Sequence, residues 1–571
     1  MSAFERTIAR LSDRFALPRI DPAAPWLRAR RIIAARLVLA LARERLIDAQ
    51  LEGGALAIAN GPALPLRRVR ALELHAPELD GDRDPLLDDP LRSWTALAAR
   101  LALSDDVVRR IAIELADGVP RLALALWIVE LRAREPASLL RLRAAPPQRD
   151  GEDLVAIGHP WHPMTKMRLG LSWTENLRYA PELLARAPIA ALDVPRALAR
   201  ISGDAIARLA PTFGTATGDR VRVPVHAAQL RRLSTRLPAD VWRALAIVPG
   251  PPVHARALLS LRTAAIADEP LHVKLALDVH TTSARRIVSP MSVANGPKIS
   301  ALLAAIARAD PLTAQGIDVM SEPGAIGLEP AVVGDVAGQL GAIVRDASMC
   351  DDAIVCAALG EIDHDGAPVI DRLLARYGGD GLAMLRDYVG VLVPPSLRLW
   401  TAHGLALELH LQNVLVRVAD GRPLGFLVRD LGGIRIHGPR LARAGHALAL
   451  DPASFIATDD ESAGASKLAH SLVHAHLAAV IGVLADRCGL DESAAWAIVR
   501  DAIAACLQTW SIVPALGDAC AFDRAHLLAA RVQAKALLRM RIEDRSSAYR
   551  FVELANPIAA HGAGAPGSDK Q

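Results

Sequence analysis

Apolar residues recur at helical spacing through the first part of the chain. In the stretches 32–41 and 107–131 they fall three or four residues apart, which predicts helices. Turn signals at Gly53-Gly54 and at 118–120 (Gly-Val-Pro) are expected to interrupt these helices. Residues 1–150 are therefore predicted to form a mainly helical N-terminal region.

A polar, proline-containing segment over residues 144–153 is predicted to mark a boundary between regions. The second region, over 151–345, contains both strand and helix signals. Within it, residues 273–280 alternate strictly, with aliphatic side chains on one side of a predicted strand. The other side carries Lys274, Asp278 and His280. This pattern predicts a half-buried strand whose polar side faces solvent or a cleft.

A third region, over residues 346–558, is predicted to contain helices around one clear β-hairpin. Its most apolar stretch, 468–485, is predicted to be a buried helix rather than a membrane span, because it contains His470, His474 and His476. In such a helix these histidines are more often structural than metal-ligating.

The predicted hairpin has two five-residue apolar strands on either side of the turn-forming segment 419–423. If this turn places Val418 opposite Leu424, then Val414 lies opposite Val428. The residues just outside the two strands then emerge side by side at the open end of the hairpin.

Composition limits the function classes. Hydrophobic residues make up 52% and charged residues 22% of the 571 residues, which excludes disorder across the chain. The Gly-, Ala- and Pro-rich end, 559–571, is predicted to be disordered. Lys+Arg number 66 against 62 Asp+Glu and are spread along the chain, which argues against nucleic acid as a partner. The charged N-terminus has no apolar signal-peptide core, so we expect a cytoplasmic protein that does not enter a membrane.

Cysteine and lysine usage add two points. The five cysteines include no C-x-x-C pair, so neither a disulfide framework nor a thiolate metal site is indicated. Only six of the 66 Lys and Arg residues are lysines. Because most cationic positions carry arginine, a lysine hints that a compact ammonium group is required at its position.

The first cluster of candidate functional residues begins at residue 158, where two His-Pro pairs fix an extended, non-helical backbone. Its donors are His159, His162, Lys166, Arg168 and Ser172. This density of donors suits an anionic ligand with several carboxylates or phosphates. The alternative is a solvated loop with ordinary surface charge. A zinc site at the two histidines is less favoured, because no third ligand follows at a metal-like spacing.

The second cluster combines cations and hydroxyls around the predicted strand at 273–280. Its members are Ser260, Arg262, Thr263, Lys274, Thr282, Ser283 and Arg286. This is phosphate-binding chemistry without a P-loop, because the chain has no G-x-x-x-x-G-K-[ST] motif. The alternative is that Arg285 and Arg286 form surface ion pairs, which does not explain Lys274 on the polar side of a regular strand.

The third cluster flanks the predicted hairpin and consists of Glu408, His410, Asn413 and Asp430. The hairpin register places Asn413 and Asp430 next to each other. Neighbouring Asn and Asp oxygens at the mouth of a hairpin suit Mg²⁺ held against nucleotide phosphates. The alternative makes Glu408 and His410 helix-surface residues and Asp430 a turn residue.

Together, these three clusters resemble the IucA/IucC family, the NRPS-independent siderophore synthetases. The resemblance covers most of residues 150–435, in the family's order. It is carried by Gly158-His-Pro-Trp-His-Pro-x-x-Lys-x-Arg-x-Gly170, Ser260-Leu-Arg-Thr263, Lys274 with Thr282-Ser-x-x-Arg286, Glu408-x-His-x-Gln-Asn413 and Arg429-Asp430. One departure is Pro-Val-His-Ala-Ala-Gln at 224–229, where the family often has Pro-Val-His-Pro-Trp-Gln, so His226 and Gln229 are left outside the predicted site.

The resemblance implies an α+β fold of three regions around a deep nucleotide cleft lined by antiparallel sheets, often in a homodimer. The regions are a helical thumb (1–150), mixed fingers (151–345) and a palm (346–558). The implied catalytic residues are Arg262, Lys274, Arg286 and His410. The implied nucleotide-binding residues are Ser260, Thr263, Lys274, Arg286, Asn413 and Asp430. Carboxylate-binding residues are His159, His162, Lys166 and Arg168, and the implied Mg²⁺ ligands are Glu408, Asn413 and Asp430.

The resemblance also implies a reaction. ATP and Mg²⁺ convert a carboxylate, commonly of citrate or a citrate derivative, into an acyl adenylate with release of pyrophosphate. An amine or an alcohol then attacks the activated carbonyl and forms an amide or an ester. Attack of a carboxylate on the α-phosphate brings anions together, so cations are required to stabilise the transition state.

Two other function classes stay open at this point. A kinase-like phosphotransferase that releases ADP fits the Asn413/Asp430 pair, but no Asp precedes Asn413 where a catalytic loop requires one. A ferric-siderophore reductase requires a cysteine cluster for an iron–sulfur centre, and Cys488, Cys506 and Cys520 lie far apart in the sequence.

Overall fold

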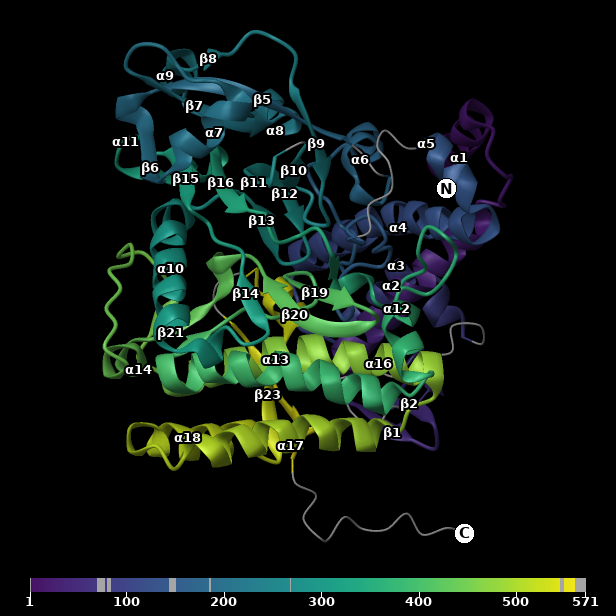
Figure 1. Ribbon diagram of the computed structural model, residues 1–571. Helices are drawn as coiled ribbons and strands as arrows, with labels where there is room; N and C mark the ends of the chain where they lie inside the picture. The colour runs from purple at the N-terminus through teal and green to yellow at the C-terminus, as the bar shows by residue number, and fades with distance from the viewer. Residues whose placement is uncertain are drawn as a thin grey trace.

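The computed structural model describes residues 2–68, 78–79, 84–142, 150–183, 186–267, 269–544 and 549–559. Helices and sheets are both abundant, which confirms the predicted α+β class. In Figure 1 a large sheet lies at the top, the N-terminal helices lie to the right, and long C-terminal helices lie at the bottom. The end predicted to be disordered, 559–571, lies outside the described residues except for Ala559.

The N-terminal region is mainly helical, as predicted, and also contains a small antiparallel sheet. Its helices are α1 (Ser2–Phe15), α2 (Ala23–Arg43), α3 (Pro90–Ala98), α4 (Asp105–Arg134) and α5 (Pro136–Leu142). Its strands are β1 (Ala49–Glu52), β2 (Ala55–Ile58), β3 (Ala63–Arg68) and β4 (Glu78–Leu79). The predicted turn at Gly53-Gly54 is confirmed between β1 and β2, where both glycines have positive φ.

The predicted helix break at 118–120 is wrong, because α4 continues through Pro120. Gly118 lies where another segment approaches closely, since a Cβ at this position would be 3.0 Å from the carbonyl oxygen of Thr165. The residues of α4 that follow are almost all buried. Their packing outweighs the cost of a proline inside a helix, which is about 3 kcal/mol.

In the described part of the chain, the second region contains a nine-stranded antiparallel sheet of order β6-β15-β16-β11-β10-β9-β5-β7, with β8 paired to β5. The strands are β5 (Arg186–Pro195), β6 (Ala199–Gly203), β7 (Arg220–His226), β8 (Ala246–Ile247), β9 (Val253–Ala257), β10 (Thr263–Ile266), β11 (Leu271–Leu275), β15 (Gly324–Leu328) and β16 (Gly341–Asp346). The helices of this region are α6 (Trp173–Tyr179), α7 (Ala205–Phe213), α8 (Ala227–Arg236), α9 (Ala239–Ala244), α10 (Pro290–Ala309) and α11 (Pro330–Val333).

The single strand predicted over 273–280 is in fact two strands. β11 ends at Leu275 in the large sheet, whereas β12 (Leu277–Thr281) pairs with β13 (Ala284–Arg286) outside it. Every residue of β11 is buried, so its polar side does not face solvent. The alternation of apolar and polar side chains continues through Ala276, although the neighbouring strand changes there. The sequence pattern therefore does not reveal the break between β11 and β12.

A four-stranded sheet of order β14-β20-β19-β17 combines one strand of the second region with three of the C-terminal region, and only its β14–β20 pair is parallel. The strands are β14 (Ile317–Val319), β17 (Ala353–Val355), β19 (Val414–Ala419) and β20 (Arg422–Val428). A smaller sheet contains β18 (Leu405–Ala406), β21 (Arg435–His437) and β22 (Ala457–Thr458). The helices are α12 (Asp371–Leu374), α13 (Gly381–His403), α14 (Gly438–Arg443), α15 (Glu461–Leu468), α16 (Ala478–Cys488), α17 (Glu492–Trp510) and α18 (Gly517–Leu527).

The hairpin is confirmed, with one correction at its turn. Val414 pairs with Val428, as predicted. Val418 pairs with the residue before Leu424 rather than with Leu424 itself, because a bulge shifts the register near the turn. The turn is a two-residue Asp-Gly turn at 420–421 with positive φ at both positions. The open end of the hairpin keeps the predicted register.

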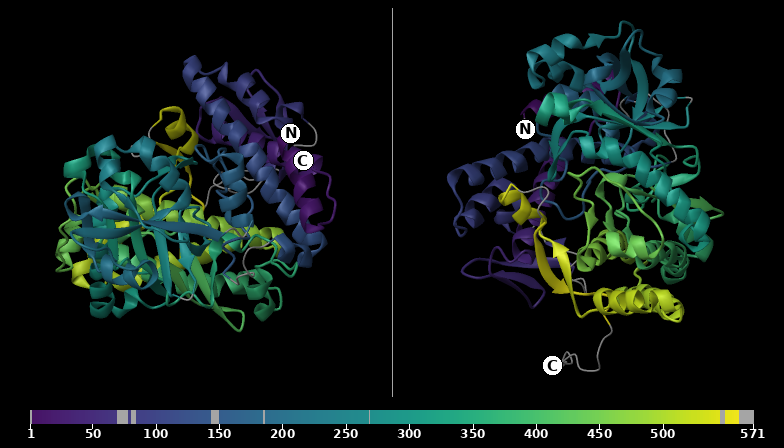
Figure 2. Two further views of the ribbon diagram at one scale, coloured as in Figure 1. Left: turned by 90° about the horizontal axis from the view of Figure 1, so that it is seen from above. Right: turned by 90° about the vertical axis from the view of Figure 1, so that its left-hand side faces the viewer.

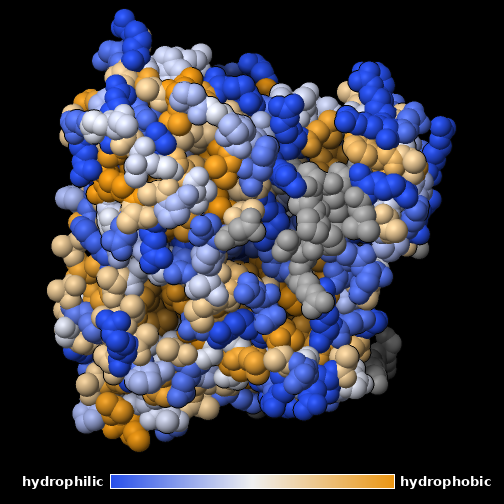
Figure 3. Space-filling model, turned by 45° about the horizontal axis from the view of Figure 1, so that its top comes forward, coloured by the Kyte–Doolittle hydropathy of each residue, from blue (hydrophilic) through white to orange (hydrophobic). Residues whose placement is uncertain are grey.

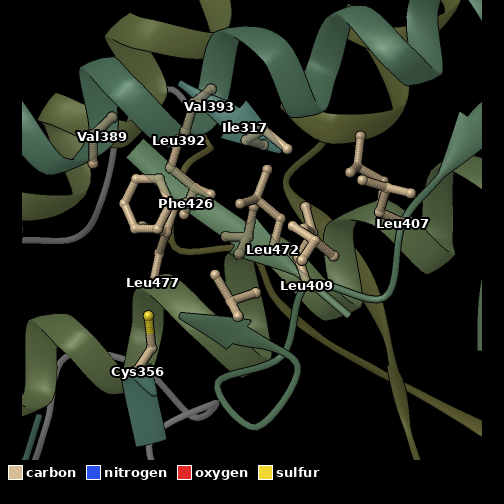
Figure 4. Packing of buried hydrophobic residues seen from close by; sticks show 14 of the residues in the cluster. Ile317, Cys356, Val389, Leu392, Val393, Leu407, Leu409, Phe426, Leu472 and Leu477 are labelled. Carbon is tan, nitrogen blue, oxygen red and sulfur yellow. The ribbon is translucent and has the colours of Figure 1, made fainter. Parts of the chain in front are cut away.

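The helical run Glu461–Cys488 confirms the buried helix predicted over 468–485. It is long and apolar enough to cross a membrane, but 72% of its most apolar window lies buried inside the protein. Its middle third, Ala469–Leu477, is a π-helix. Leu472 in this segment, Phe426 of β20 and Leu392 of α13 pack in the C-terminal core (Figure 4). On the face shown in Figure 3, hydrophobic residues lie scattered among hydrophilic ones.

His476 has the structural role expected for a histidine in this helix. Its Nδ1 lies 2.8 Å from the Leu409 carbonyl oxygen, and its Nε2 lies 2.7 Å from the Tyr388 hydroxyl.

After α18 the chain leaves the C-terminal core and returns to the N-terminal helices. Strands β23 (Arg531–Lys535) and β24 (Phe551–Ala555) pair with each other. Between them, α19 (Leu537–Ile542) packs into the hydrophobic core of the N-terminal region. Figure 2 shows this yellow segment next to the purple and blue helices.

Candidate functional site

The second and third clusters meet at one ion pair. Lys274 of β11 and Asp430, which follows β20, are 156 residues apart in the sequence, yet Lys274 Nζ lies 2.6 Å from Asp430 Oδ1. The Lys274 side chain is buried, whereas 27% of the Asp430 side chain is exposed. The polar side of β11 therefore points toward a partly open space beside the end of the hairpin.

Asp430 has a backbone conformation that non-glycine residues rarely adopt, with φ of 75°. Two other residues of the predicted motifs, Lys166 and Thr282, also have positive φ. Such conformations cost roughly 1–3 kcal/mol each and gather at functional sites. The Asp430 side chain also accepts the N–H of Gly432 at 3.3 Å, which fixes the turn that follows β20.

Arg262 is placed by a tight turn that leads into β10. The N–H of Thr263 donates to the Ser260 carbonyl at 2.7 Å, and Thr263 lies opposite Lys274 on the neighbouring strand. The guanidinium of Arg262 donates to the Ile287 carbonyl. Its Nε is buried with no hydrogen-bond partner within the described structure, so this group can still bind a ligand.

Arg286 and Arg285 point to different partners. Arg286 donates to the hydroxyls of Thr281 and Thr282 and lies among the site residues. Arg285 Nε donates to Asp278 Oδ1 at 2.8 Å, and half of the Arg285 side chain is exposed. The surface ion pair considered for both arginines is therefore found for Arg285.

Three cations surround Asp430 in this site, and one of them, Arg345, also pairs with Glu322 at 2.8 Å. Burial alone would raise the pKa of Asp430, but Lys274, Arg345 and Arg262 outweigh burial and hold its pKa far below its usual value. Burial lowers the pKa of Arg262 to about 10, and Arg286 adds repulsion. Burial also lowers the pKa of Lys274, although Asp430 opposes this shift. The excess of positive charge favours a further anion at this place.

Glu408 is bound by cationic and amide groups. Lys467 of α15 donates to Glu408 Oε1, and His410 Nε2 lies 4.0 Å from the other carboxylate oxygen. Asn413 Nδ2 donates to the Glu408 carbonyl oxygen at 3.3 Å. Burial raises the pKa of Glu408, but Lys467 and His410 bring it down to about 2. Asn413 Nδ2 also donates to Glu408 Oε2 at 3.5 Å, so both carboxylate oxygens of Glu408 have a partner.

The predicted magnesium ligands do not make a metal site from protein groups alone. They suit a Mg²⁺ ion that also binds the phosphates of a nucleotide. Among the described residues, no group of three or more His, Cys, Asp or Glu side chains is arranged to hold a metal ion. Mg²⁺ usually binds one or two protein ligands and completes its shell with water and phosphate oxygens. Asp430 and the amide oxygen of Asn413 suit this role, whereas Glu408 is tied to Lys467.

The two histidines of the first cluster are neutral donors. His159 Nδ1 accepts the N–H groups of Trp161 and His162 at 3.2 Å, so its proton is on Nε2. His162 Nδ1 accepts the N–H of Met164, and its Nε2 donates to Ser283 Oγ at 2.8 Å. Burial lowers the pKa of His162 to about 3 and that of His159 well below its usual value. The contact with Ser283 joins the first cluster to the second.

The first cluster also approaches the third. After burial and His162, His410 is the next group that lowers the pKa of His159. The ring of Trp161 lies 6.2 Å from that of His470 in the π-helix. All three clusters are therefore connected.

Lys166 and Arg168 are buried and share one acidic partner. Arg168 Nη2 lies 3.0 Å and Lys166 Nζ 3.6 Å from the carboxylate of Glu182. Lys166 also donates to the Val155 carbonyl at 2.9 Å, and Arg168 to Asn176 Oδ1 at 2.7 Å. These contacts use the cationic ends of both side chains to hold the His-Pro loop. The geometry gives both side chains a structural role, and their contact with substrate stays a prediction.

Replacing Glu182 with glutamine is expected to lower the free energy of unfolding by about 3–5 kcal/mol, because two cations are left buried and unpaired. Urea denaturation measures this loss. Burial raises the pKa of Glu182, but Arg168 and Lys166 bring it down to about 2 from 4.5. The stabilisation is therefore present above pH 4.5 and is lost as the pH falls toward 2, so the difference between the two proteins shrinks over this range.

The control for this variant is Asp501→Asn, which breaks the exposed pair between Arg500 and Asp501. It is expected to cost less than about 1 kcal/mol. An equally small loss for Glu182→Gln would show that the buried pairs do not hold the loop.

Two lysines near the site were missed by the sequence prediction, namely Lys467 and Lys535. Lys467 binds Glu408, as described above. Lys535 Nζ lies 3.9 Å from the ring centroid of Tyr549, and burial together with repulsion from Lys467 lowers its pKa to about 7. The scarcity of lysine in this arginine-rich chain was the available signal for both residues.

His226 and Gln229, which the sequence departure left outside the site, have internal partners. His226 Nδ1 accepts the N–H of Ala228 at 3.1 Å. Gln229 Nε2 donates to the Gln339 carbonyl at 2.8 Å, and its Oε1 accepts the N–H of Asp278 at 2.8 Å. Both residues support the fold beside the site.

A pocket lies beside Lys274, between the start of α10 and the segment after β20. Its apolar walls include Met291, Ile343 and Phe455, and its polar lining includes Asn295 and the carboxylate of Glu322. Apolar walls with a few polar groups suit a flat aromatic ligand with a hydrogen-bonding rim.

Comparison with known proteins gives two family-model matches, which together cover the three clusters. The IucA / IucC family model matches residues 148–361, and the model of the ferric iron reductase FhuF-like transporter matches residues 383–550. Staphyloferrin A synthase from Staphylococcus aureus is 29% identical over 435 residues, which cover 71% of this chain and 72% of that protein. The chain is similar to proteins of the IucA/IucC family.

Solved structures share the fold of this chain. Petrobactin biosynthesis protein AsbB from Bacillus anthracis has a TM-score of 0.77 at 18% identity, with 98% of both chains covered. ATP-bound aerobactin synthetase IucA from Klebsiella pneumoniae has a TM-score of 0.74 at 18% identity, with 93% of this chain and 100% of that chain covered. At these identities the likeness shows the fold.

The resemblance predicted from the sequence motifs is confirmed. The comparisons give no support to a kinase-like phosphotransferase. The match of residues 383–550 to the ferric iron reductase FhuF-like model bears on the reductase alternative, and the described residues contain no cysteine cluster.

Proposed function

We propose that this protein is an ATP- and Mg²⁺-dependent synthetase that adenylates a carboxylate of citrate or a citrate derivative. It then condenses the adenylate with an amine or an alcohol to form an amide or an ester. The observation that carries the proposal is the meeting of Lys274, Arg262 and Arg286 around Asp430, from segments far apart in the sequence. The proposal includes the predicted cytoplasmic location and homodimer.

The cations supply what the first half-reaction requires. A carboxylate oxygen forms a bond to the α-phosphorus while the bond to the pyrophosphate oxygen breaks, so negative charge gathers on the phosphate oxygens. Lys274, Arg262 and Arg286 neutralise this charge in a buried place, where charge interactions are stronger than in water. Ser260 and Thr263 shape the turn that presents Arg262.

The pocket beside Lys274 is where we place the base and ribose of the nucleotide. Met291, Ile343 and Phe455 provide apolar contacts for a flat ring, and Asn295 provides a polar edge. Because Lys274 lines the same pocket and also binds Asp430, a nucleotide in this pocket has its phosphates at the cationic group. Asn413 and Asp430 would hold Mg²⁺, which when bound neutralises phosphate charge.

The His-Pro loop is where we place the acid substrate. His159 Nε2 carries a proton and serves as a neutral hydrogen-bond donor to a carboxylate. His162 supports the same wall through Ser283, and His410 approaches from the hairpin side. The acid is then held between the loop and the cationic group, with one carboxylate facing the α-phosphate.

The test is the identity of the products. Purified protein with ATP and Mg²⁺ is incubated with a panel of carboxylic acids, and with amines and alcohols as acceptors. We expect AMP and pyrophosphate in equal amounts, dependent on one of the acids, and hydroxylamine trapping of the acyl adenylate. Release of ADP and phosphate instead would overturn the proposal.

A further inference from the structure

A buried carboxylate lies in the polar segment that is predicted to mark a boundary between the first two regions. This carboxylate belongs to Glu152, and only 1% of its side chain is exposed. Glu152 is not a member of any of the three clusters. A charged group that is removed from water requires partners, and those of Glu152 come from two parts of the chain that are far apart in the sequence.

The first partner is Arg429, which directly precedes Asp430. Arg429 Nη1 lies 2.5 Å from Glu152 Oε1 and Nη2 lies 3.2 Å from Oε2, so the ion pair is bidentate. The same guanidinium donates to the Gln412 carbonyl from Nε at 3.1 Å and from Nη2 at 2.8 Å. Arg429 therefore ties together the two strand ends of the hairpin, next to Asn413 and Asp430.

The second partner is the backbone of Leu259. Glu152 Oε2 accepts the Leu259 N–H at 2.8 Å. Leu259 directly precedes the turn at 260–263, which presents Arg262 to the site. One carboxylate thus binds both the end of the hairpin and the start of the arginine turn.

The backbone on the N-terminal side of Glu152 is itself fixed. Gly151 has φ of 71°, and a Cβ at this position would lie 2.7 Å from a neighbouring side-chain carbon, so the segment packs closely. Asp150 pairs with Arg256 of β9 at 2.5 Å, and the Asp150 carbonyl accepts the N–H of Val355 in β17 at 2.8 Å. The segment is therefore attached both to the nine-stranded sheet and to the sheet that contains the hairpin.

These contacts add a second link between two parts of the site. The first link is the ion pair of Lys274 with Asp430, which joins the large sheet to the end of the hairpin. One such contact fixes a distance, whereas two contacts also fix an orientation. Buried ion pairs are weak evidence for stability, because apolar residues often replace them without loss, and their best-attested use is to select one arrangement.

We propose that Glu152 is a positioning residue that fixes the orientation of Arg262 relative to Asp430. This inference rests on the proposed function. Because Glu152 is buried, it acts on the reaction through Arg262 and not by contact with a substrate. A displacement of about 1 Å at a reacting centre costs on the order of 10²-fold in rate, so a loosened arginine turn slows adenylate formation.

The experiment measures acid-dependent pyrophosphate release by two variants of the full-length protein. Glu152→Asp keeps the charge that Arg429 requires, but its shorter side chain cannot also reach the Leu259 N–H. We expect its kcat to fall by at least about tenfold. In the second variant, Glu152→Met is combined with Arg429→Met, which removes the ion pair and leaves no unpaired buried charge. We expect this variant to unfold at a temperature close to that of the wild type, yet with kcat lowered by at least about tenfold.

Two further measurements separate positioning from a role in stability alone. Arg262→Ala is introduced into the Glu152→Asp protein, and the combined variant is expected to match Arg262→Ala alone within about twofold, because the two residues act as one unit. Hydrogen exchange at the Leu259 N–H and in the turn at 260–263 is expected to be faster in Glu152→Asp than in the wild type.

The matched control is Asp523→Asn in the C-terminal region. Asp523 accepts two hydrogen bonds from Arg440 at 2.9 and 2.8 Å, and both side chains are fully buried, as in the pair of Glu152 with Arg429. This variant is expected to lose thermal stability while pyrophosphate release per folded molecule stays the same. Exchange in the turn at 260–263 is also expected to stay as in the wild type.

Three outcomes would overturn the inference. They are an unchanged kcat in folded Glu152→Asp, additive losses when Arg262→Ala is combined with it, and wild-type activity in the double methionine variant. Failure of the proposed function looks different, because the wild-type protein itself would then release no pyrophosphate with any acid of the panel.

Discussion

Asp430→Ala is expected to reduce acid-dependent pyrophosphate release by at least about 10³-fold, because the cationic group then loses the carboxylate that organises it. The Lys274 ammonium loses its partner at 2.6 Å, and the open end of the hairpin loses one of its two candidate magnesium ligands. Asp430→Asn keeps the side-chain shape and is expected to lose nearly as much activity, since the charge rather than the volume is required. Pyrophosphate release measured under saturating ATP tests both variants.

The matched control is Asp420→Asn at the other end of the same hairpin. Asp420 also has positive φ, which asparagine tolerates, and it lies in an exposed turn. Its replacement is expected to leave activity within twofold. Circular dichroism should show folded protein for all three variants. More than a tenth of wild-type activity in folded Asp430→Ala would count against a central role for this residue.

Arg262→Ala is expected to lower the same activity by about 10²–10³-fold, because a buried cation with an unused Nε is removed from the developing phosphate charge. Arg262→Lys keeps a charge but loses the planar guanidinium, so only partial recovery is expected. Pre-steady-state measurement of adenylate formation separates this loss from any effect on the later attack by the amine.

Arg285→Ala serves as the control for Arg262. Arg285 belongs to the same sequence motif, but it forms a half-exposed ion pair with Asp278. Its removal is expected to change the rate by less than threefold. If the two alanine variants lost activity equally, the division between a site arginine and a surface arginine would be incorrect.

The sequence was sufficient for the hairpin and for the residues at its open end. The alternation of apolar residues and the turn signals fix which strand faces which, so Val414 opposite Val428 was predictable although the turn itself was misjudged by one residue. Motifs also named Lys274 and Asp430 separately. Their contact at 2.6 Å depends on how the nine-stranded sheet packs on the C-terminal region, which no local pattern encodes.

Other features depend on partners that the sequence does not reveal. Lys166 and Arg168 read as ligand-binding cations because their shared partner, Glu182, has no distinguishing local signal. The break between β11 and β12 is invisible because the alternation of side chains continues while the partner strand changes. Lys535 reaches the site only because a segment near the end of the chain returns to the N-terminal helices.

The most direct measurement is a crystal structure with Mg²⁺ and a non-hydrolysable ATP analogue. The account predicts phosphates in contact with Lys274, Arg262 and Arg286, the base in the pocket lined by Met291 and Phe455, and the metal next to Asp430 and Asn413. An analogue bound outside this pocket, or phosphates that touch none of the three cations, would contradict it.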